Sequence, residues 1–201
     1  MKWNSNIAYA IGLITTDGNL SKDGRHIVFV SKDIALVKLF KKCLKLKNKI
    51  SSKTSGYSNG KGRYYFVQFG NVNFYIKLMS IGLSPNKSKN IAKLLIPKKY
   101  FADFLRGHLD GDGSILAYND PIYHNSRILY IRFISASEAH IRWLQSQIKK
   151  FYEIVGKTRP ATRVWILVYA KNASKSLLRI VYYKRNLPCL PRKRDIVEDY
   201  L

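Results

Sequence analysis

The sequence reads Ala10-Ile11-Gly12-Leu13-Ile14-Thr15-Thr16-Asp17-Gly18 early in the chain and Leu105-Arg106-Gly107-His108-Leu109-Asp110-Gly111-Asp112-Gly113 at its middle. Both nonapeptides are helix-like runs that end in an Asp-Gly pair, and in both of them small residues stand four positions apart. A single Asp-Gly pair is usually a turn, but two in matching contexts are not explained by a turn alone. The duplicated acids predict one paired site.

The residues that follow the two nonapeptides repeat the same order of elements, which indicates an internal duplication. The predicted elements are strands at residues 26–30 and 127–134, helices at 34–46 and 139–151, strands at 63–69 and 163–169, and helices at 72–81 and 173–182. Residues 135–138 have the pattern of a capping box ahead of the second of these helices. Residues 51–62 are typical of a loop. We predict an α+β fold with repeats at residues 1–96 and 97–201.

The charge of the chain is strongly positive. Lys and Arg number 36 against 12 Asp and Glu, which gives a formal net charge of +24. The first hundred residues hold only three acids, Asp17, Asp23 and Asp33, so an acid kept there is expected to have a task. A polyanion is the expected partner.

Two other features narrow the class of protein. No apolar run reaches the roughly 20 residues of a membrane-spanning helix and no signal peptide is evident, so a soluble intracellular protein is expected. Two cysteines, Cys43 and Cys189, are too few for a disulfide framework or a zinc site, and both are expected to be reduced core residues.

The small residues indicate how the two nonapeptides meet. Gly12 and Thr16 share one helix face, as do Gly107 and Gly111, so two such helices can pack closely side by side. Their C-terminal ends would then bring the two terminal acids together. Paired carboxylates suit Mg²⁺, which prefers oxygen ligands and can activate water for phosphodiester hydrolysis.

With these residues in view, the chain resembles the LAGLIDADG homing endonucleases of the monomeric, two-motif kind, and the resemblance runs from about residue 6 to the end. It implies two αββαββα repeats that form a saddle of antiparallel sheets on the DNA major groove. It also implies Mg²⁺-dependent cleavage of both strands across the minor groove, at a long pseudo-palindromic or asymmetric site. Mn²⁺ would substitute for Mg²⁺, and Ca²⁺ would bind without supporting cleavage. An intron-encoded monomer without an obligate protein partner is expected.

The resemblance carries roles to particular positions. Asp17 and Asp112 match the metal-binding acids, and the carbonyls of Thr16 and Gly111 match further ligands. The basic residues that match those near the scissile phosphates are Lys87 and Lys193, with Lys89, Arg192 and Arg194 as competitors for the register. The first motif departs from the family pattern at Thr15, where an acid often stands, and the second departs at His108.

Strand side chains are the candidates for base contacts, because a sheet in the major groove presents alternate residues to base edges. The full set of expected DNA contacts is Arg25, Arg63, Tyr64, Phe66, Gln68, Lys89, Arg127, Tyr130, Arg132, Arg192 and Arg194. Residues 129, 131 and 133 should face the helices. Residues 164–169 are apolar on both faces, so the sequence leaves open which of them faces DNA.

Simpler interpretations apply to several residues. Asp110 is expected to be a solvated or capping residue, and His108 a packing residue. A rival function is an RNA-splicing maturase or a non-cleaving DNA-binding protein with the same saddle. A basic structural coat for nucleic acid is a third possibility, and it predicts no sequence preference and no dependence on divalent metal.

Overall fold

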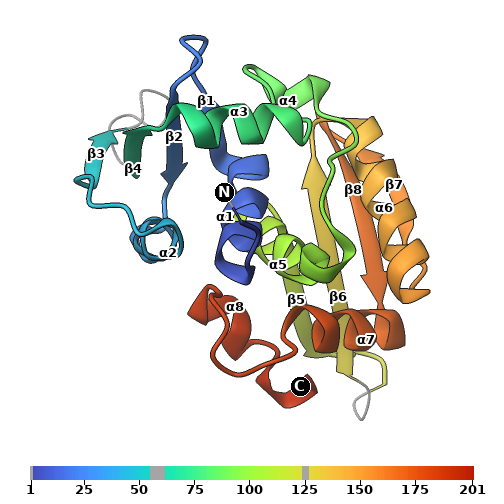
Figure 1. Cartoon of the computed structure of the whole chain (residues 1–201). Coiled ribbons are helices and arrows are strands. Elements are labelled where there is room, and N and C mark those ends of the chain that lie inside the picture. The colour runs from blue at the N-terminus through green and yellow to red at the C-terminus, as the bar shows by residue number, and fades with distance from the viewer. Residues whose placement is uncertain (1, 55–61, 124–126) are drawn as a thin grey trace.

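Figure 1 shows the computed structural model of the chain, which describes residues 2–54, 62–123 and 127–201. The first unit comprises α1 (Ser5–Asp17), β1 (Gly18–Leu20), β2 (His26–Ser31), α2 (Ile34–Leu44), β3 (Ser51–Thr54), β4 (Arg63–Gly70), α3 (Val72–Ser80) and the short α4 (Lys87–Asn90). The second comprises α5 (Phe101–Gly111) after a 3-10 turn at Lys98–Tyr100, then β5 (Ser114–Asn119), β6 (Arg127–Ser135), α6 (Glu138–Tyr152), β7 (Lys157–Ala161), β8 (Val164–Ala170), α7 (Lys171–Val181), the short α8 (Pro191–Asp195) and a 3-10 turn at Glu198–Tyr200.

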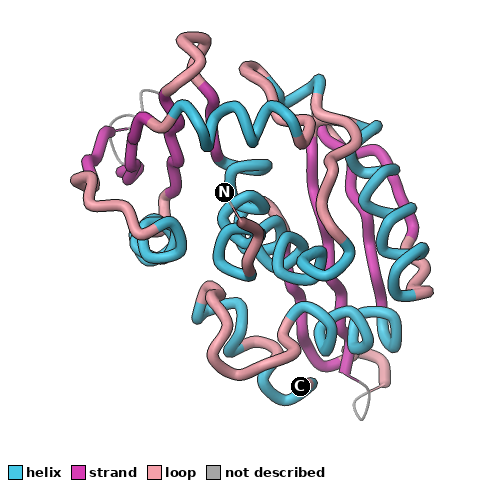
Figure 2. The backbone as a smooth tube through the Cα atoms, viewed as in Figure 1, coloured by secondary structure: helices cyan, strands magenta, loops and turns pink. Residues whose placement is uncertain are grey.

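The two units form two four-stranded antiparallel sheets, which lie on either side of the central helices α1 and α5 (Figure 2). The strand order is β1-β2-β4-β3 in one sheet and β5-β6-β8-β7 in the other. The hairpin registers also correspond, because Gly18 pairs with Phe29 and Ser114 with Arg132, each at the start of its sheet. The predicted α+β class and αββαββα repeat are confirmed.

Alternation along the strands puts one face of each sheet into the core. Leu129, Ile131 and Phe133 of β6 are fully buried, as the alternation predicts. Strand β8 resolves the ambiguity of its two apolar faces: Leu167 and Tyr169 are buried, so Val164, Ile166 and Val168 lie on the opposite, outer face. The sequence alone could not separate these faces, because both are apolar.

Two local predictions need correction. Helix α6 begins at Glu138, and its N-cap is Ser137, whose hydroxyl accepts a hydrogen bond from the His140 amide at 3.3 Å. The predicted capping box with Ser135 as its first residue is therefore wrong. Residues Ser51–Thr54, predicted as loop, form edge strand β3 because their backbone pairs with β4; residues 55–61 of that predicted loop lie outside the described residues.

Both cysteines are free thiols, with Cys43 buried and Cys189 half-buried. Among the described residues, no helix has the length and apolar character needed to cross a membrane.

Candidate metal and nucleic-acid site

The site is built on the contact between α1 and α5. A Cβ placed on Gly107 would lie 2.1 Å from the Tyr9 carbonyl oxygen, and one on Gly12 would lie 2.2 Å from the Phe104 carbonyl oxygen. A Cβ on Gly111 would lie 2.0 Å from the Thr16 hydroxyl. The two backbones therefore touch at positions where only hydrogen fits, and the helices reach their C-terminal ends side by side.

The two acids stand at these helix ends. Asp17 is the last residue of α1, and Asp112 is the C-cap of α5. Burial raises the pKa of Asp17 to about 7, and the nearby carboxylate of Asp112 raises it as well. Burial in the concavity also raises the pKa of Asp112, although its side chain keeps an exposed surface. Because a helix C-terminus is itself a negative pole, the site favours a cation.

Two buried lysines lie beside the acids, one from each unit. Lys87 of α4 and Lys193 of α8 are each only 5% exposed. Lys87 donates to the carbonyl of Gly18. Lys193 donates to three carbonyls: that of Leu109, that of Asp110 at 3.0 Å and that of Gly113 at 2.8 Å. These bonds satisfy carbonyl oxygens that a helix end leaves without an internal partner.

Burial lowers the pKa of both lysines to about 8, while Asp17 and Asp112 oppose this shift. The other basic residues considered for these positions lie elsewhere. Lys89 is exposed, Arg192 pairs with Asp33 at 3.2 Å, and Arg194 pairs with Glu198 at 3.2 Å. The structure thus brings Lys87 and Lys193 to the acids and leaves the three competitors at the surface.

A cavity of about 340 Å³ opens next to Asp112. Hydroxyl groups line it from several elements, namely Thr15, Thr16, Ser88 and Ser135. The cavity is wide enough for several waters between the acids and the end of β6. The donor atoms around it are oxygens, which suits a hard cation rather than a soft one.

The outer face of the first sheet carries most of the residues expected to contact DNA there. Tyr64 and Phe66 are half-buried and Gln68 is exposed on β4, with Lys32 above the Tyr64 ring at 5.3 Å and Lys53 above the Phe66 ring at 5.9 Å. Arg25 and Arg63 are exposed at the ends of their strands. The position of Lys53 opposite Tyr64 was not evident from the sequence, because β3 was not predicted.

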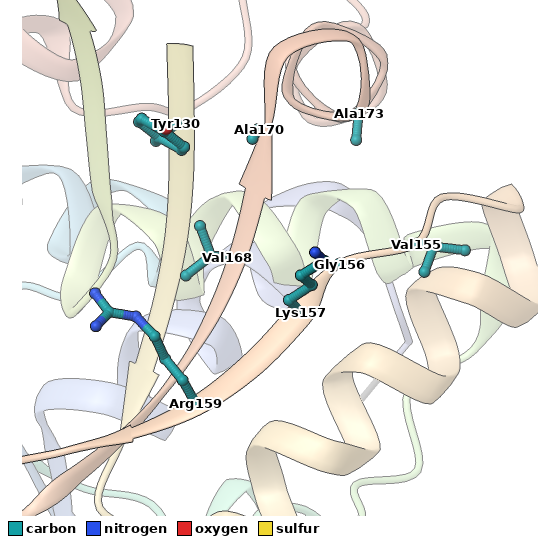
Figure 3. A pocket seen from close by; sticks show the side chains of 8 residues that line it. All are labelled: Tyr130, Val155, Gly156, Lys157, Arg159, Val168, Ala170 and Ala173. Atoms are coloured by element: carbon teal, nitrogen blue, oxygen red, sulfur yellow. The ribbon is translucent and has the colours of Figure 1, made fainter. Parts of the chain in front are cut away.

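The outer face of the second sheet is more apolar. Tyr130 and Arg132 of β6 lie on it, and Val168 stands opposite Arg132. Figure 3 shows a cavity of about 390 Å³ on this sheet, lined among others by Tyr130 and Val168 and by Lys157 and Arg159 of β7. Lys157 and Arg159 were missed by the sequence reasoning, although their spacing of two was a usable signal for one strand face.

The remaining expected contacts are engaged within the chain. Arg127 is exposed and pairs with Asp199 at 2.9 Å. Arg194 also donates to the carbonyl of Arg185 at 2.8 Å, so it holds the C-terminal segment together. His108, expected to be a packing residue, is buried and stacks on His140.

Asp110 departs from the expectation of a solvated residue, since it is 1% exposed. Its Oδ2 accepts hydrogen bonds from the Tyr9 hydroxyl and from the Leu190 amide, both at 2.7 Å. Burial raises its pKa to about 6, and the two hydrogen bonds oppose that shift. The sequence gave no sign of this burial, because both partners lie about eighty or more residues away.

No family model matches the chain, and no curated protein matches it in sequence. Solved structures do match. The homing endonuclease I-WcaI bound to its DNA recognition sequence has a TM-score of 0.69 and 12% identity, covering 97% of this chain and 88% of that one. Mesophilic variants of the homing endonuclease I-DmoI give a TM-score of 0.60 and 15% identity, with 94% and 97% covered.

A third match is full-length DUF199/WhiA from Thermatoga maritima, with a TM-score of 0.61 and 17% identity. It covers all of this chain, but this chain spans only 63% of the WhiA protein. At such low identities the likeness establishes the fold and not the activity. The two repeats, their sheets and the paired motif helices therefore give this chain the LAGLIDADG homing endonuclease fold in its single-chain, two-motif form.

Proposed function

We propose that this protein is a monomeric, site-specific DNA endonuclease that hydrolyses one phosphodiester bond on each strand across the minor groove. The observation that carries the proposal is the pairing of Asp17 and Asp112 at adjacent helix ends, with Lys87 and Lys193 buried beside them. A protein that only binds phosphate gains nothing from two acids in a cleft that faces a polyanion.

The residues present fit a divalent cation. In the metal-free chain the pKa of both acids is raised, so negative charge at the site is not fully compensated. Asp17 and Asp112 would hold the ion, with the carbonyls of Thr16 and Gly111 as further oxygen ligands. Among the described residues no group of three or more His, Cys, Asp or Glu side chains gathers. Water and substrate phosphate would therefore complete the coordination, as Mg²⁺ commonly requires.

A bound Mg²⁺ supplies stabilisation of the charge that develops on the phosphate and an acidified attacking water. The chain's own residues do the rest. Lys87 and Lys193 set positive charge beside the same phosphates, where a buried ammonium acts in a low dielectric. The outer faces of the two sheets bind the duplex on either side of the cut, and the net charge of +24 attracts the DNA backbone.

Several structural neighbours support this proposal. I-WcaI and I-LtrWI are described as homing endonucleases bound to DNA targets. I-DmoI variants are described in complex with target DNA in the presence of Mg and with DNA and Mn. The use of Mg²⁺, with Mn²⁺ as a substitute, is proposed here on that likeness together with the two acids.

The direct test is selection of cleaved duplexes from a random library in the presence of Mg²⁺. The expected result is a single long, asymmetric consensus that is cut on both strands. The same selection with Ca²⁺ should enrich bound duplexes without cutting them. Retention of DNA without any cut product under Mg²⁺ would contradict the nuclease.

A second candidate is a nucleic-acid-binding protein without cleavage, either a DNA regulator or an RNA maturase. The observation that favours it is that WhiA, which is not described as a nuclease, shares the fold over this whole chain. Affinities for structured RNA and for duplex DNA at one salt concentration discriminate the two, because salt alone shifts both by orders of magnitude.

Metal binding is expected to depend on pH in a defined direction. Because the pKa of Asp17 is about 7, the carboxyl holds its proton below that pH and must lose it when a metal binds. The apparent Mg²⁺ affinity should fall about tenfold per pH unit below 7. Calorimetry in buffers of different ionisation enthalpy should detect about one proton released at pH 6 and almost none at pH 8.5. Affinity that is constant from pH 5.5 to 8.5 would refute this assignment.

The two half-sites are expected to be recognised with different chemistry. Gln68 and Val168 occupy equivalent places, opposite Val28 and Arg132 in the two sheets. Gln68→Ala should lower discrimination at one base pair of one half-site by about 1–3 kcal/mol, because an amide can bond adenine edges. Val168→Ala is the matched control, since valine offers no hydrogen bond. Cleavage of every single-base variant of the target measures both, and an unchanged profile for Gln68→Ala would exclude a base contact.

A further inference from the structure

Asp110 joins three elements that carry the proposed site. It lies one turn from the end of α5, and its Oδ2 accepts the Tyr9 hydroxyl of α1 and the Leu190 amide, each at 2.7 Å. Its Oδ1 is buried and has no hydrogen-bond partner among the described residues. One oxygen of a fully buried acid therefore holds both the partner motif helix and the segment that enters α8.

Leu190 is the N-cap of α8, and Pro191 follows it at the first helical position. A helix of five residues cannot maintain its own position, because its few internal bonds do not offset the cost of nucleation. Its place must come from anchors. The Leu190 amide on Asp110 is one anchor, and Lys193 on the carbonyls at the end of α5 is the other.

The anchors of α8 also saturate Lys193. An ammonium group has three donors, and the carbonyls of Leu109, Asp110 and Gly113 accept three bonds from this one. These carbonyls flank Asp112 in the sequence. Asp110 and Lys193 together therefore clamp the turn that carries the second acid.

The first repeat lacks this clamp. Thr15 stands where the second repeat has Asp110, and its hydroxyl donates within its own helix to the Ile11 carbonyl at 2.8 Å. The N-cap of α4, Asn86, makes no side-chain capping bond. Among the described residues Lys87 donates to one carbonyl, that of Gly18. The two lysines are thus positioned by different means.

We propose that Asp110 is a positioning residue that holds α8, and through it Lys193, on the end of α5, and so controls cleavage of one of the two DNA strands. The inference rests on the proposed endonuclease function. Asp110 does not touch the substrate. Its effect passes through the bond to the Leu190 amide, which distinguishes it from Asp112 two residues later.

The test uses four variants and a target duplex with a different label on each strand. Asp110→Ala removes both hydrogen bonds, whereas Asp110→Asn keeps an oxygen that can accept both. Tyr9→Phe removes the bond within the helix pair but leaves the Leu190 bond. Thr15→Val is the matched control at the equivalent place in the first repeat.

Asp110→Ala is expected to slow one strand about 10²-fold, as misplacement of a charged group by about 1 Å can do. Lys193→Met should slow the same strand, and Lys87→Met the other. Asp110→Asn, Tyr9→Phe and Thr15→Val should keep the strand ratio of the unaltered protein. A loss of stability alone would slow both strands together, so equal slowing in Asp110→Ala overturns the proposal.

Amide hydrogen exchange of the metal-free protein separates this inference from the proposed function. Asp110→Ala should speed exchange across residues 189–195 at least tenfold without affecting residues 85–90. If the unaltered protein cuts no DNA, the nuclease proposal fails, and exchange still decides whether Asp110 holds α8. Unchanged exchange at residues 189–195 overturns the positioning role whatever the nuclease result.

Discussion

Asp17→Asn and Asp112→Asn are each expected to abolish double-strand cleavage, with the rate falling by about 10³-fold or more. An amide has nearly the shape of the acid, but it binds a divalent cation weakly and keeps the carbonyl bonds of the neighbouring lysines. Affinity for DNA should be retained or increased, because one negative charge leaves a surface that faces phosphates. Strand-resolved cleavage with Mg²⁺ and binding in its absence measure the two effects.

The control is Glu153→Gln, which removes an exposed acid at the end of α6. It should cleave at the normal rate. Undiminished double-strand cleavage by Asp17→Asn or Asp112→Asn would remove the role assigned to that acid.

The same variants carry an independent signature in stability. The pKa of Asp17 is raised from 3.8 to about 7, so the folded chain binds more protons than the unfolded chain between these values. Stability of the metal-free protein should therefore decrease as pH rises from 4 to 7. Asp17→Asn should flatten that slope and raise the melting temperature at pH 8. A site that costs stability until its cation binds is typical of functional acids.

Gly107→Ala is expected to reduce the free energy of unfolding by about 3 kcal/mol, which corresponds to about 10 °C in Tm for a chain of this size. The added methyl group would meet the Tyr9 carbonyl at 2.1 Å, and a backbone atom cannot rotate away. Gly12→Ala should behave alike, because its methyl group would meet the Phe104 carbonyl at 2.2 Å. Both substitutions force the helices apart, so cleavage should also be lost.

Gly70→Ala is the matched control for the helix glycines. A methyl group there would meet first the Nε of Arg25, at 2.9 Å, and that flexible side chain can move aside. Its Tm should change by less than about 2 °C. If Gly107→Ala melted at the same temperature as the unaltered protein, the close approach of α1 and α5 would not be a constraint on the fold.

The sequence by itself determined the architecture, because the signals for it are local and occur twice. Two Asp-Gly nonapeptides with small residues four apart predict a helix pair, and period-two alternation at residues 127–134 marks the buried face of a strand. The match at Lys87 and Lys193 came from resemblance to a family rather than from any local pattern. Only their burial against the helix ends separates them from Lys89, Arg192 and Arg194.

The tertiary structure decided what depends on partners distant in sequence. Both faces of β8 are apolar, so only packing against the helices determines that Leu167 points inward. Asp110 looks like a polar residue of a turn, yet it becomes a buried acceptor because Tyr9 and Leu190 arrive from elsewhere in the chain. Hydrophobic period is written along the chain, whereas the burial of a polar group depends on which donors the fold brings to it.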